Sequence, residues 1–97
     1  MALAYKGPVV LGINWYSGMS SPDSRGYIDV TGTLLGGHAI LANEINTMRR
    51  VVRLHNSWGP NWGSKGNCFI SFEELDRLLK EGGEACVPVK RALVPIK

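Results

Sequence analysis

The sequence lacks any long hydrophobic run. Its apolar stretches, such as residues 9–11, are far shorter than the roughly 20 residues that a membrane-spanning helix needs. The profile of a disordered chain is missing too, because 44% of the residues are hydrophobic and 20% are charged. Both classes are therefore excluded. With 97 residues the chain has room for one core, and we expect a soluble single domain over residues 1–97.

The sequence also lacks a large excess of positive or negative charge. Eleven basic and eight acidic side chains leave a net charge of +3. The excess is scattered and has no interleaved aromatic side chains that would stack on bases. We interpret it as solvated surface, and expect neither a nucleic-acid nor a membrane partner. Residues 1–8 have no basic region and reach Gly-Pro before an apolar stretch forms, so no secretory signal is predicted and the compartment stays open.

Cysteine is nearly absent as well. Cys68 and Cys86 are too few for a disulfide scaffold, and two cysteines do not fix a redox compartment. Two buried thiols are the simplest interpretation, with a mutual disulfide as the alternative.

Hydrophobic patterning predicts a mainly β (α+β) chain. Its β-prone runs lie at residues 9–15, 27–30, 38–45, 50–58 and 68–71, separated by loops rich in glycine, serine, asparagine and proline. A short polar connection joins the runs 38–45 and 50–58, which we expect to pair as a hairpin. A last extended run over residues 86–94 contains Pro88, which favours an edge strand.

One helix is predicted, over about residues 72–82. Ser71 and Glu74 form a capping-box pattern at its start, and Gly82-Gly83 ends it. Its apolar residues recur at helical spacing and are assigned to the core: Phe72, Leu75, Leu78 and Leu79. On the solvent face we expect the pairs Glu73–Arg77 and Asp76–Lys80. Together these elements form a small antiparallel sheet with one amphipathic helix packed on it.

Two clusters lie at opposite ends of the predicted hairpin, Gly-Gly-His-Ala-Ile at residues 36–40 and Asn-Ser-Trp-Gly-Pro-Asn-Trp-Gly at residues 56–63. If the loop is centred on Thr47, position 38 lies opposite position 56. Directly opposed side chains are close enough for an amide oxygen to accept a hydrogen bond from an imidazole. An imidazole held in one tautomer can take a proton from a thiol and later give it to a leaving amine. We therefore predict a His38–Asn56 pair.

The tryptophans complete this cluster. Trp58 lies on the same strand face as Asn56, where it would cover the His–Asn hydrogen bond, and Trp62 would stand on the loop beside it. His55 lies on the opposite face and is given no catalytic role.

Gly-His-Ala-Ile at residues 37–40, followed by Asn-Ser-Trp-Gly-Pro-Asn-Trp-Gly, resembles the His and Asn motifs of papain-like cysteine peptidases. The flanking segments 7–10 and 66–70 also resemble strands of that family, so the resemblance covers nearly the whole chain. It implies the C-terminal (right-hand, β) lobe, and a half-barrel of antiparallel strands. It makes His38 the catalytic base and Asn56 its orienter.

The same resemblance assigns further residues. Trp58 becomes the shield of the site and Trp62 a wall on the leaving-group side. Gly12 and Ala39 would border the pocket for the substrate side chain that sets specificity. No metal or cofactor is implied, and the substrate is a peptide or protein.

The chain departs from the family in one large respect. The nucleophilic cysteine and the oxyanion-hole glutamine belong to an N-terminal lobe, and neither motif occurs here. Cys68 and Cys86 both follow the Asn motif and lack the surroundings of the nucleophile. Cys86 resembles a family cysteine that often forms a disulfide, but the usual partner before the His motif is missing. The helix is longer than in papain, which indicates a divergent branch, microbial or viral.

Two hypotheses follow. In the first, the chain supplies base and orienter once a cysteine-bearing lobe joins it, in cis or in trans, and is inactive alone. In the second, it is a truncated, non-catalytic homologue that binds peptides or associates with itself. The face that normally packs against the other lobe would be apolar, and we expect a homodimer or a larger species when the chain is alone.

Overall fold

The structure, a computed structural model, describes residues 8–89 and 92–95. In that part of the chain the elements follow in the order β1 (Val9–Tyr16), η1 (Ser17–Ser20), β2 (Leu34–Asn46), β3 (Val51–His55), β4 (Asn67–Ser71), α1 (Phe72–Lys80), β5 (Glu84–Val89) and β6 (Ala92–Pro95). The described strands form one six-stranded sheet in the order β4-β3-β2-β1-β5-β6, with antiparallel neighbours. The prediction of a mainly β fold with one helix is confirmed.

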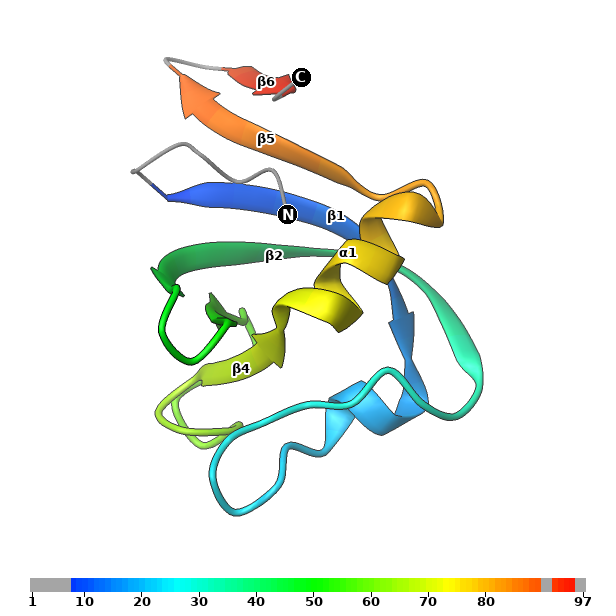
Figure 1. Cartoon of the computed structure of the whole chain (residues 1–97), viewed down its shortest axis with the longest axis vertical. Helices are drawn as coiled ribbons and strands as arrows, with labels where there is room; N and C mark the ends of the chain where they lie inside the picture. Colours follow the sequence, from blue (N-terminus) through cyan, green and yellow to red (C-terminus); the bar gives the residue numbers. More distant parts are fainter. Residues whose placement is uncertain (1–7, 90–91, 96–97) are drawn as a thin grey trace.

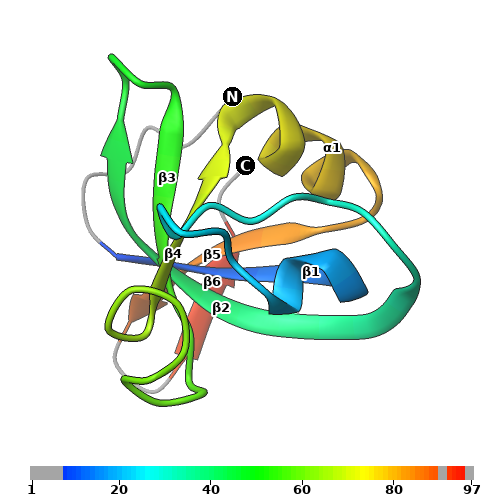
Figure 2. The same cartoon turned by 90° about the horizontal axis from the view of Figure 1, so that it is seen from below.

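The core lies between one face of the sheet and α1, which crosses β1 and β2 in Figure 1. Alternate residues of β1, of the middle of β2 and of β4 supply it, as the strand period of two requires. The buried strand residues include Leu11 and Ile13 of β1, Ile40 of β2, Leu54 of β3 and Ile70 of β4. The view in Figure 2 shows that the sheet is strongly twisted, with β3 running steeply across the direction of β1 and β2.

The predicted hairpin is present, but its register differs from the prediction. The turn occupies residues 47–50, and Asn46 pairs with Val51. Beside the turn even-numbered residues therefore face odd-numbered ones, as in the pair Glu44↔Arg53. A β-bulge at Asn43 changes this, so that Ala42 pairs with Leu54. From the bulge onward even-numbered residues of both strands share one face, which includes positions 38 and 56.

The run at residues 86–94 is two strands and not one. β5 and β6 pair with each other on either side of residues 90–91, which lie outside the described residues. β5 also pairs with β1, through Glu84, Ala85 and Cys86, so it is an interior strand and β6 lies at the end of the sheet. Pro88 lies beyond the stretch that pairs with β1, and its missing N–H therefore removes no hydrogen bond from that ladder. The run at residues 27–30 forms only one isolated bridge, from Tyr27 to Phe69.

Helix α1 begins as predicted and ends two residues earlier. The Ser71 hydroxyl accepts a hydrogen bond from the backbone N–H of Glu74 at 3.2 Å. Glu81 is the C-cap, and Gly82 has a φ of +100°, a left-handed conformation that suits glycine and stops the helix. Leu75 and Leu78 are fully buried, and Phe72 and Leu79 pack against the core, as predicted.

One of the two predicted ion pairs on the helix forms. Lys80 lies 2.8 Å from Asp76. Glu73 pairs instead with Arg50 of the hairpin turn, at 2.9 Å, and Arg77 pairs with Glu81 at 3.1 Å. A long exposed side chain can pair with any oppositely charged group within reach. The spacing of residues within the helix therefore did not suffice to predict the partners of Glu73 and Arg77.

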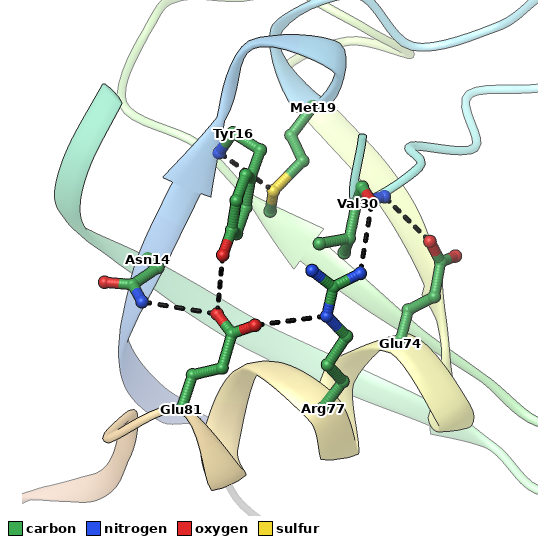
Figure 3. A network of polar contacts seen from close by, with 7 residues as sticks. All are labelled: Asn14, Tyr16, Met19, Val30, Glu74, Arg77 and Glu81. Atoms are coloured by element: carbon green, nitrogen blue, oxygen red, sulfur yellow. Dashed lines mark hydrogen bonds and ion pairs between the residues drawn. The ribbon is translucent and has the colours of Figure 1, made fainter. Parts of the chain in front are cut away.

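A polar network joins α1 to the end of β1 (Figure 3). Glu81 accepts hydrogen bonds from the Tyr16 hydroxyl at 2.8 Å and from Asn14 Nδ2 at 3.3 Å. From the next turns of the helix, Arg77 donates to the backbone oxygen of Val30 at 3.5 Å, and Glu74 accepts from the Val30 N–H at 2.7 Å (Figure 3). The helix thereby holds the end of β1 and, through Val30, the second half of the connection between β1 and β2.

Among the described residues, no helix has the length and apolar character to cross a membrane. The prediction that no secretory signal is present rests largely on residues 1–7, which lie outside the described residues.

Candidate active site

The predicted contact between His38 and Asn56 is present. His38 lies in β2 opposite Ile13 of β1, and its Nε2 is 3.0 Å from Oδ1 of Asn56. The prediction that positions 38 and 56 are directly opposed is wrong, because continuing the Ala42↔Leu54 register places residue 56 opposite residue 40. Asn56 follows the last residue of β3 and reaches His38 along the diagonal, a distance that a polar side chain spans.

The amide of Asn56 has a fixed orientation. Its side chain is buried, with 2% exposed, and its Oδ1 accepts the backbone N–H of Ser57 at 2.8 Å. An N–H only donates, so the atom facing it must be the oxygen. Turning the amide over would place two N–H donors against each other and lose the bond to Ser57. The Nδ2 of Asn56 is also buried, and it has no hydrogen-bond partner in the described part of the chain.

This orientation assigns the proton of His38. Because Asn56 Oδ1 is an acceptor, Nε2 of the neutral imidazole must carry the N–H, an assignment that follows from the hydrogen-bond pattern. The lone pair of the ring is then on Nδ1. A neutral imidazole in this tautomer can accept a proton through Nδ1 while Nε2 stays bonded to the amide.

Two tryptophans flank the imidazole. The ring centroid of Trp58 lies 5.2 Å from that of His38, and Trp58 remains 46% exposed. Trp15 of β1 lies closer, at 4.8 Å edge to face, and is only 3% exposed. Sequence reasoning missed Trp15. The signal that could have found it is the alternation of β1, because Trp15 follows Leu11 and Ile13 on the buried face.

Trp62 stands behind this pair. Its ring centroid is 5.3 Å from Trp58 and 6.3 Å from Trp15. Ser20 of η1 holds two of the three rings. Its hydroxyl accepts a hydrogen bond from Trp15 Nε1, and its backbone oxygen accepts one from Trp62 Nε1, both at 2.9 Å. The predicted place of Trp62, on the loop beside the site, agrees with this arrangement.

A shallow hollow of about 190 Å³ opens beside the imidazole. It is lined by Trp15, Leu35, Gly36, Gly37, His38 and Trp58. Leu35 is 62% exposed at its rim, and Leu34 beside it is also exposed. No charged side chain lines the hollow. Among the described residues, the only polar side chain within hydrogen-bond distance of His38 is the neutral amide of Asn56.

Gly12 and Ala39 lie together, next to this site. They pair across β1 and β2, one position along from the Ile13↔His38 pair, and both are exposed. Adjacent strand residues point to opposite faces, so they border the sheet surface on the side away from the His38 ring. Space above Gly12 is open, because an added Cβ would meet no atom within 4 Å. Their role beside a substrate stays a prediction.

Neither cysteine is placed as a nucleophile. Cys68 of β4 is fully buried opposite Leu54, and burial raises the pKa of its thiol to about 12. Reaction requires the thiolate, which this burial disfavours. Cys86 is buried on β5, and both thiols are free. Three strands separate β4 from β5, about 19 Å at ordinary strand spacing, so the alternative of a mutual disulfide is wrong.

His55 is exposed and bonds through Nδ1 to Asn67 Oδ1 at 3.0 Å. It lies on the strand face opposite Leu54, as predicted.

Comparison with known proteins points in the same direction. No family model matches the chain, and a search of the curated proteins gives no match. Among the solved structures, xylellain, a cysteine protease from Xylella fastidiosa, is 32% identical over 69% of this chain, with a TM-score of 0.59. The chain has a cysteine-protease-like fold. It spans about a quarter of xylellain, covering 26% of that chain.

Proposed function

We propose that the chain is the C-terminal lobe of a papain-like cysteine peptidase, with His38 as catalytic base and Asn56 as its orienter. The observation that carries the proposal is the 3.0 Å contact between His38 Nε2 and Asn56 Oδ1, in an amide that the Ser57 N–H holds in one orientation. The likeness to a bacterial cysteine protease supports it.

In the complete enzyme a second lobe, joined in cis or in trans, supplies the cysteine. Nδ1 of His38 takes the thiol proton, and the thiolate attacks the peptide carbonyl carbon. The imidazolium then gives its proton to the leaving amine, which leaves a thioester. His38 next takes a proton from water, and the water oxygen attacks the thioester carbon. The carbon–sulfur bond then breaks, the carboxylic acid is released, and the imidazolium returns the proton to the departing thiolate. Donors of the second lobe would hold the oxyanion.

A neutral amide suits this chemistry. The thiolate supplies the negative charge that stabilises the imidazolium, so the orienting group needs only to accept a hydrogen bond from the Nε2–H. Trp58 covers one side of the imidazole, although its 46% exposure leaves the ring open to a neighbouring surface. We propose that the second lobe completes this cover by packing over the hollow at Leu35, which is lined by apolar side chains.

The test is to join the chain to the cysteine-bearing lobe of a peptidase such as xylellain and to measure peptide hydrolysis. We expect His38→Ala to lower kcat/KM by about 100-fold or more, the usual contribution of a general base. Asn56→Ala should lower it less, because the base remains. His55→Ala is the matched control, since His55 is exposed on the other strand face. Equal losses in both histidine variants, or turnover unaffected by His38→Ala, would contradict the proposal.

The specificity residues need a separate test. We propose that Gly12 and Ala39 border the pocket for the substrate side chain, as the resemblance implies; both are exposed, although they lie on the sheet face away from the His38 ring. In the joined enzyme, Gly12→Val should then change the preference between large and small substrate side chains. A uniform effect on all substrates would assign Gly12 to another role.

A second candidate, a self-associating module, is favoured by the exposed Leu34, Leu35 and Trp58 beside the hollow. We expect sedimentation of the chain alone to show a dimer at micromolar concentration, which Leu35→Ser weakens. Met48→Ser is the control, because Met48 is 95% exposed at the tip of the hairpin. A monomer at all concentrations would contradict self-association and leave the peptidase proposal intact.

A further inference from the structure

A second hollow lies on the other face of the sheet. It has a volume of about 500 Å³ and includes the side chains of Arg25, Arg49, Arg53, Glu44, Tyr27 and Phe69. We call it the arginine hollow. Arg53 and Phe69 alternate along their strands with fully buried core residues, so they point away from the core. The arginine hollow is therefore separate from the His38 site.

Its side chains form a row across the sheet. Glu44 of β2 pairs with Arg53 of β3, Arg53 pairs with Phe69 of β4, and Tyr27 bridges to Phe69 from outside the sheet. The rings of Tyr27 and Phe69 lie 5.5 Å apart, and the guanidinium of Arg25 lies 4.5 Å over the Tyr27 ring. Arginines thus lie at both ends of an aromatic floor.

The surrounding contacts position the arginines. Asn43 Oδ1 accepts Arg53 Nε at 2.9 Å, and Asn46 Oδ1 accepts the backbone N–H of Arg49 at 3.0 Å. Asp23 Oδ1 accepts the backbone N–H groups of Arg25 and Tyr27, at 2.8 Å and 3.0 Å, which fixes the turn that carries Arg25. The bulge, the hairpin turn and the 23–27 turn therefore converge on one surface.

The charge of the arginine hollow is unbalanced. Three guanidinium groups face one carboxylate among its lining residues, that of Glu44. Glu44 lies 3.6 Å from Arg53 and Asp23 lies 3.6 Å from Arg25, both in exposed pairs that solvent screens. Guanidinium groups bind carboxylates through paired N–H donors, so further acidic groups are the ligands that this surface favours.

We propose that the arginine hollow binds an extended acidic peptide segment of another protein. The arginines come from successive segments across the sheet, and Arg53 and the segment of Arg25 are about two strand spacings, roughly 10 Å, apart. Carboxylates on alternate residues of an extended peptide lie on one side, about 7 Å apart, and their side chains reach this span.

Two other occupants fit less well. A second copy of this chain carries a net charge of +3, and among the described residues none of its strands has more than one acidic side chain to offer. A single strand of nucleic acid requires open aromatic faces for stacking. Here Arg25 covers one face of Tyr27, and Tyr27 packs against Phe69.

The experiment uses the chain as it is and a dye-labelled peptide of alternating glutamate and serine. The matched probe carries glutamine for glutamate, and a thymidine oligonucleotide is the third probe. We expect the glutamate peptide to bind at low salt and more tightly than either other probe. Its affinity should fall as the salt concentration rises. Equal binding of the glutamine peptide, or tighter binding of the oligonucleotide, would overturn the proposal.

Variants and shift mapping locate the site. Arg53→Gln should weaken binding about tenfold, the loss of one charge-assisted contact. Arg49→Gln, in the turn, provides a second variant in case the first disturbs the sheet. Lys80→Gln removes the same charge from α1 and should leave binding unchanged. Backbone shifts on titration should occur at Arg53 and Phe69. Shifts confined to His38 and Trp58, or an equal loss in Lys80→Gln, would contradict the assignment without bearing on the peptidase proposal.

Discussion

The imidazole of His38 is oriented by a relay that begins in the backbone. The Ser57 N–H fixes Asn56 Oδ1, and Asn56 Oδ1 in turn fixes Nε2 of His38. Because Asn56 is buried, water cannot replace either bond, and breaking one would leave a buried polar group without a partner at a cost in free energy. The orienting amide is therefore held by its neighbour in sequence, while the histidine that it orients comes from another strand.

The buried thiol of Cys68 should make the stability of the protein depend on pH in the alkaline range. Its thiol keeps its proton to about pH 12 when folded, whereas the ordinary value is 9.0. The unfolded chain therefore loses that proton first, and the free energy of unfolding should fall as the pH rises from about 9 to 12. Denaturant titrations across this range should show a shallower fall in Cys68→Ala. An unchanged slope would show that other groups, such as Tyr16, whose pKa is also raised, account for the alkaline loss.

At the scale of single elements, α1 depends on carboxylates that remain charged. The Tyr16 hydroxyl, Asn14 and Arg77 all bond to Glu81 and lower its pKa below the ordinary 4.5 (Figure 3). A lowered folded pKa means that this stabilisation is complete above about pH 4.5 and is lost as the pH falls through the folded value. Glu81→Gln should therefore flatten the acid limb of a stability profile, measured by denaturant unfolding between about pH 5 and 3.

The matched control for this prediction is Glu44→Gln. Glu44 is also exposed and paired, with Arg53 at 3.6 Å, but it lies on β2 and has no contact with the network of α1. An equal flattening in both variants would contradict a specific role of Glu81.

The bulge in β2 supports a second prediction at this scale. Asn43 is the extra residue between the pairs Ala42↔Leu54 and Glu44↔Arg53. Deleting it should leave a regular ladder with those pairs unchanged, and His38 should stay on the face of Asn56. We expect a loss of about 1 kcal/mol, the value of the hydrogen bond to Arg53, in denaturant unfolding. Loss of the His38–Asn56 contact in nuclear magnetic resonance spectra would show that the bulge itself positions the histidine.

The sequence predicted the elements well and the long-range details poorly. The start of α1 is encoded locally, in Ser71 and Glu74, so it could be predicted. The hairpin register depends on a bulge that no local residue signals. The predicted register placed residue 56 opposite residue 38, and the observed register places it opposite residue 40. Because this error is an even number of residues, His38 and Asn56 were still predicted on the same face. Trp15 was missed because its contact with His38 is made across strands that are paired only in the fold.

At the scale of the whole molecule, the two faces of the sheet carry different chemistry. One side presents His38 in a hollow lined by apolar side chains, and the other presents the three arginines of the arginine hollow. The apolar hollow fits the packing of a second lobe, and the basic one fits an acidic ligand. The loops that shape both surfaces are held by side chains of the sheet and helix, which explains how one small core supports two separate sites.

The position of the proton on the neutral His38 ring tests directly whether Asn56 orients a base toward a thiol. We predict that the ring ¹⁵N resonances of the neutral His38 imidazole show the proton on Nε2 and the lone pair on Nδ1, and that Asn56→Ala mixes the two tautomers. His55 serves as the reference within the same spectrum, because its Nδ1 contacts Asn67. A proton on Nδ1 of His38 in the wild-type chain would contradict the account, since the ring could not then accept a thiol proton at that atom.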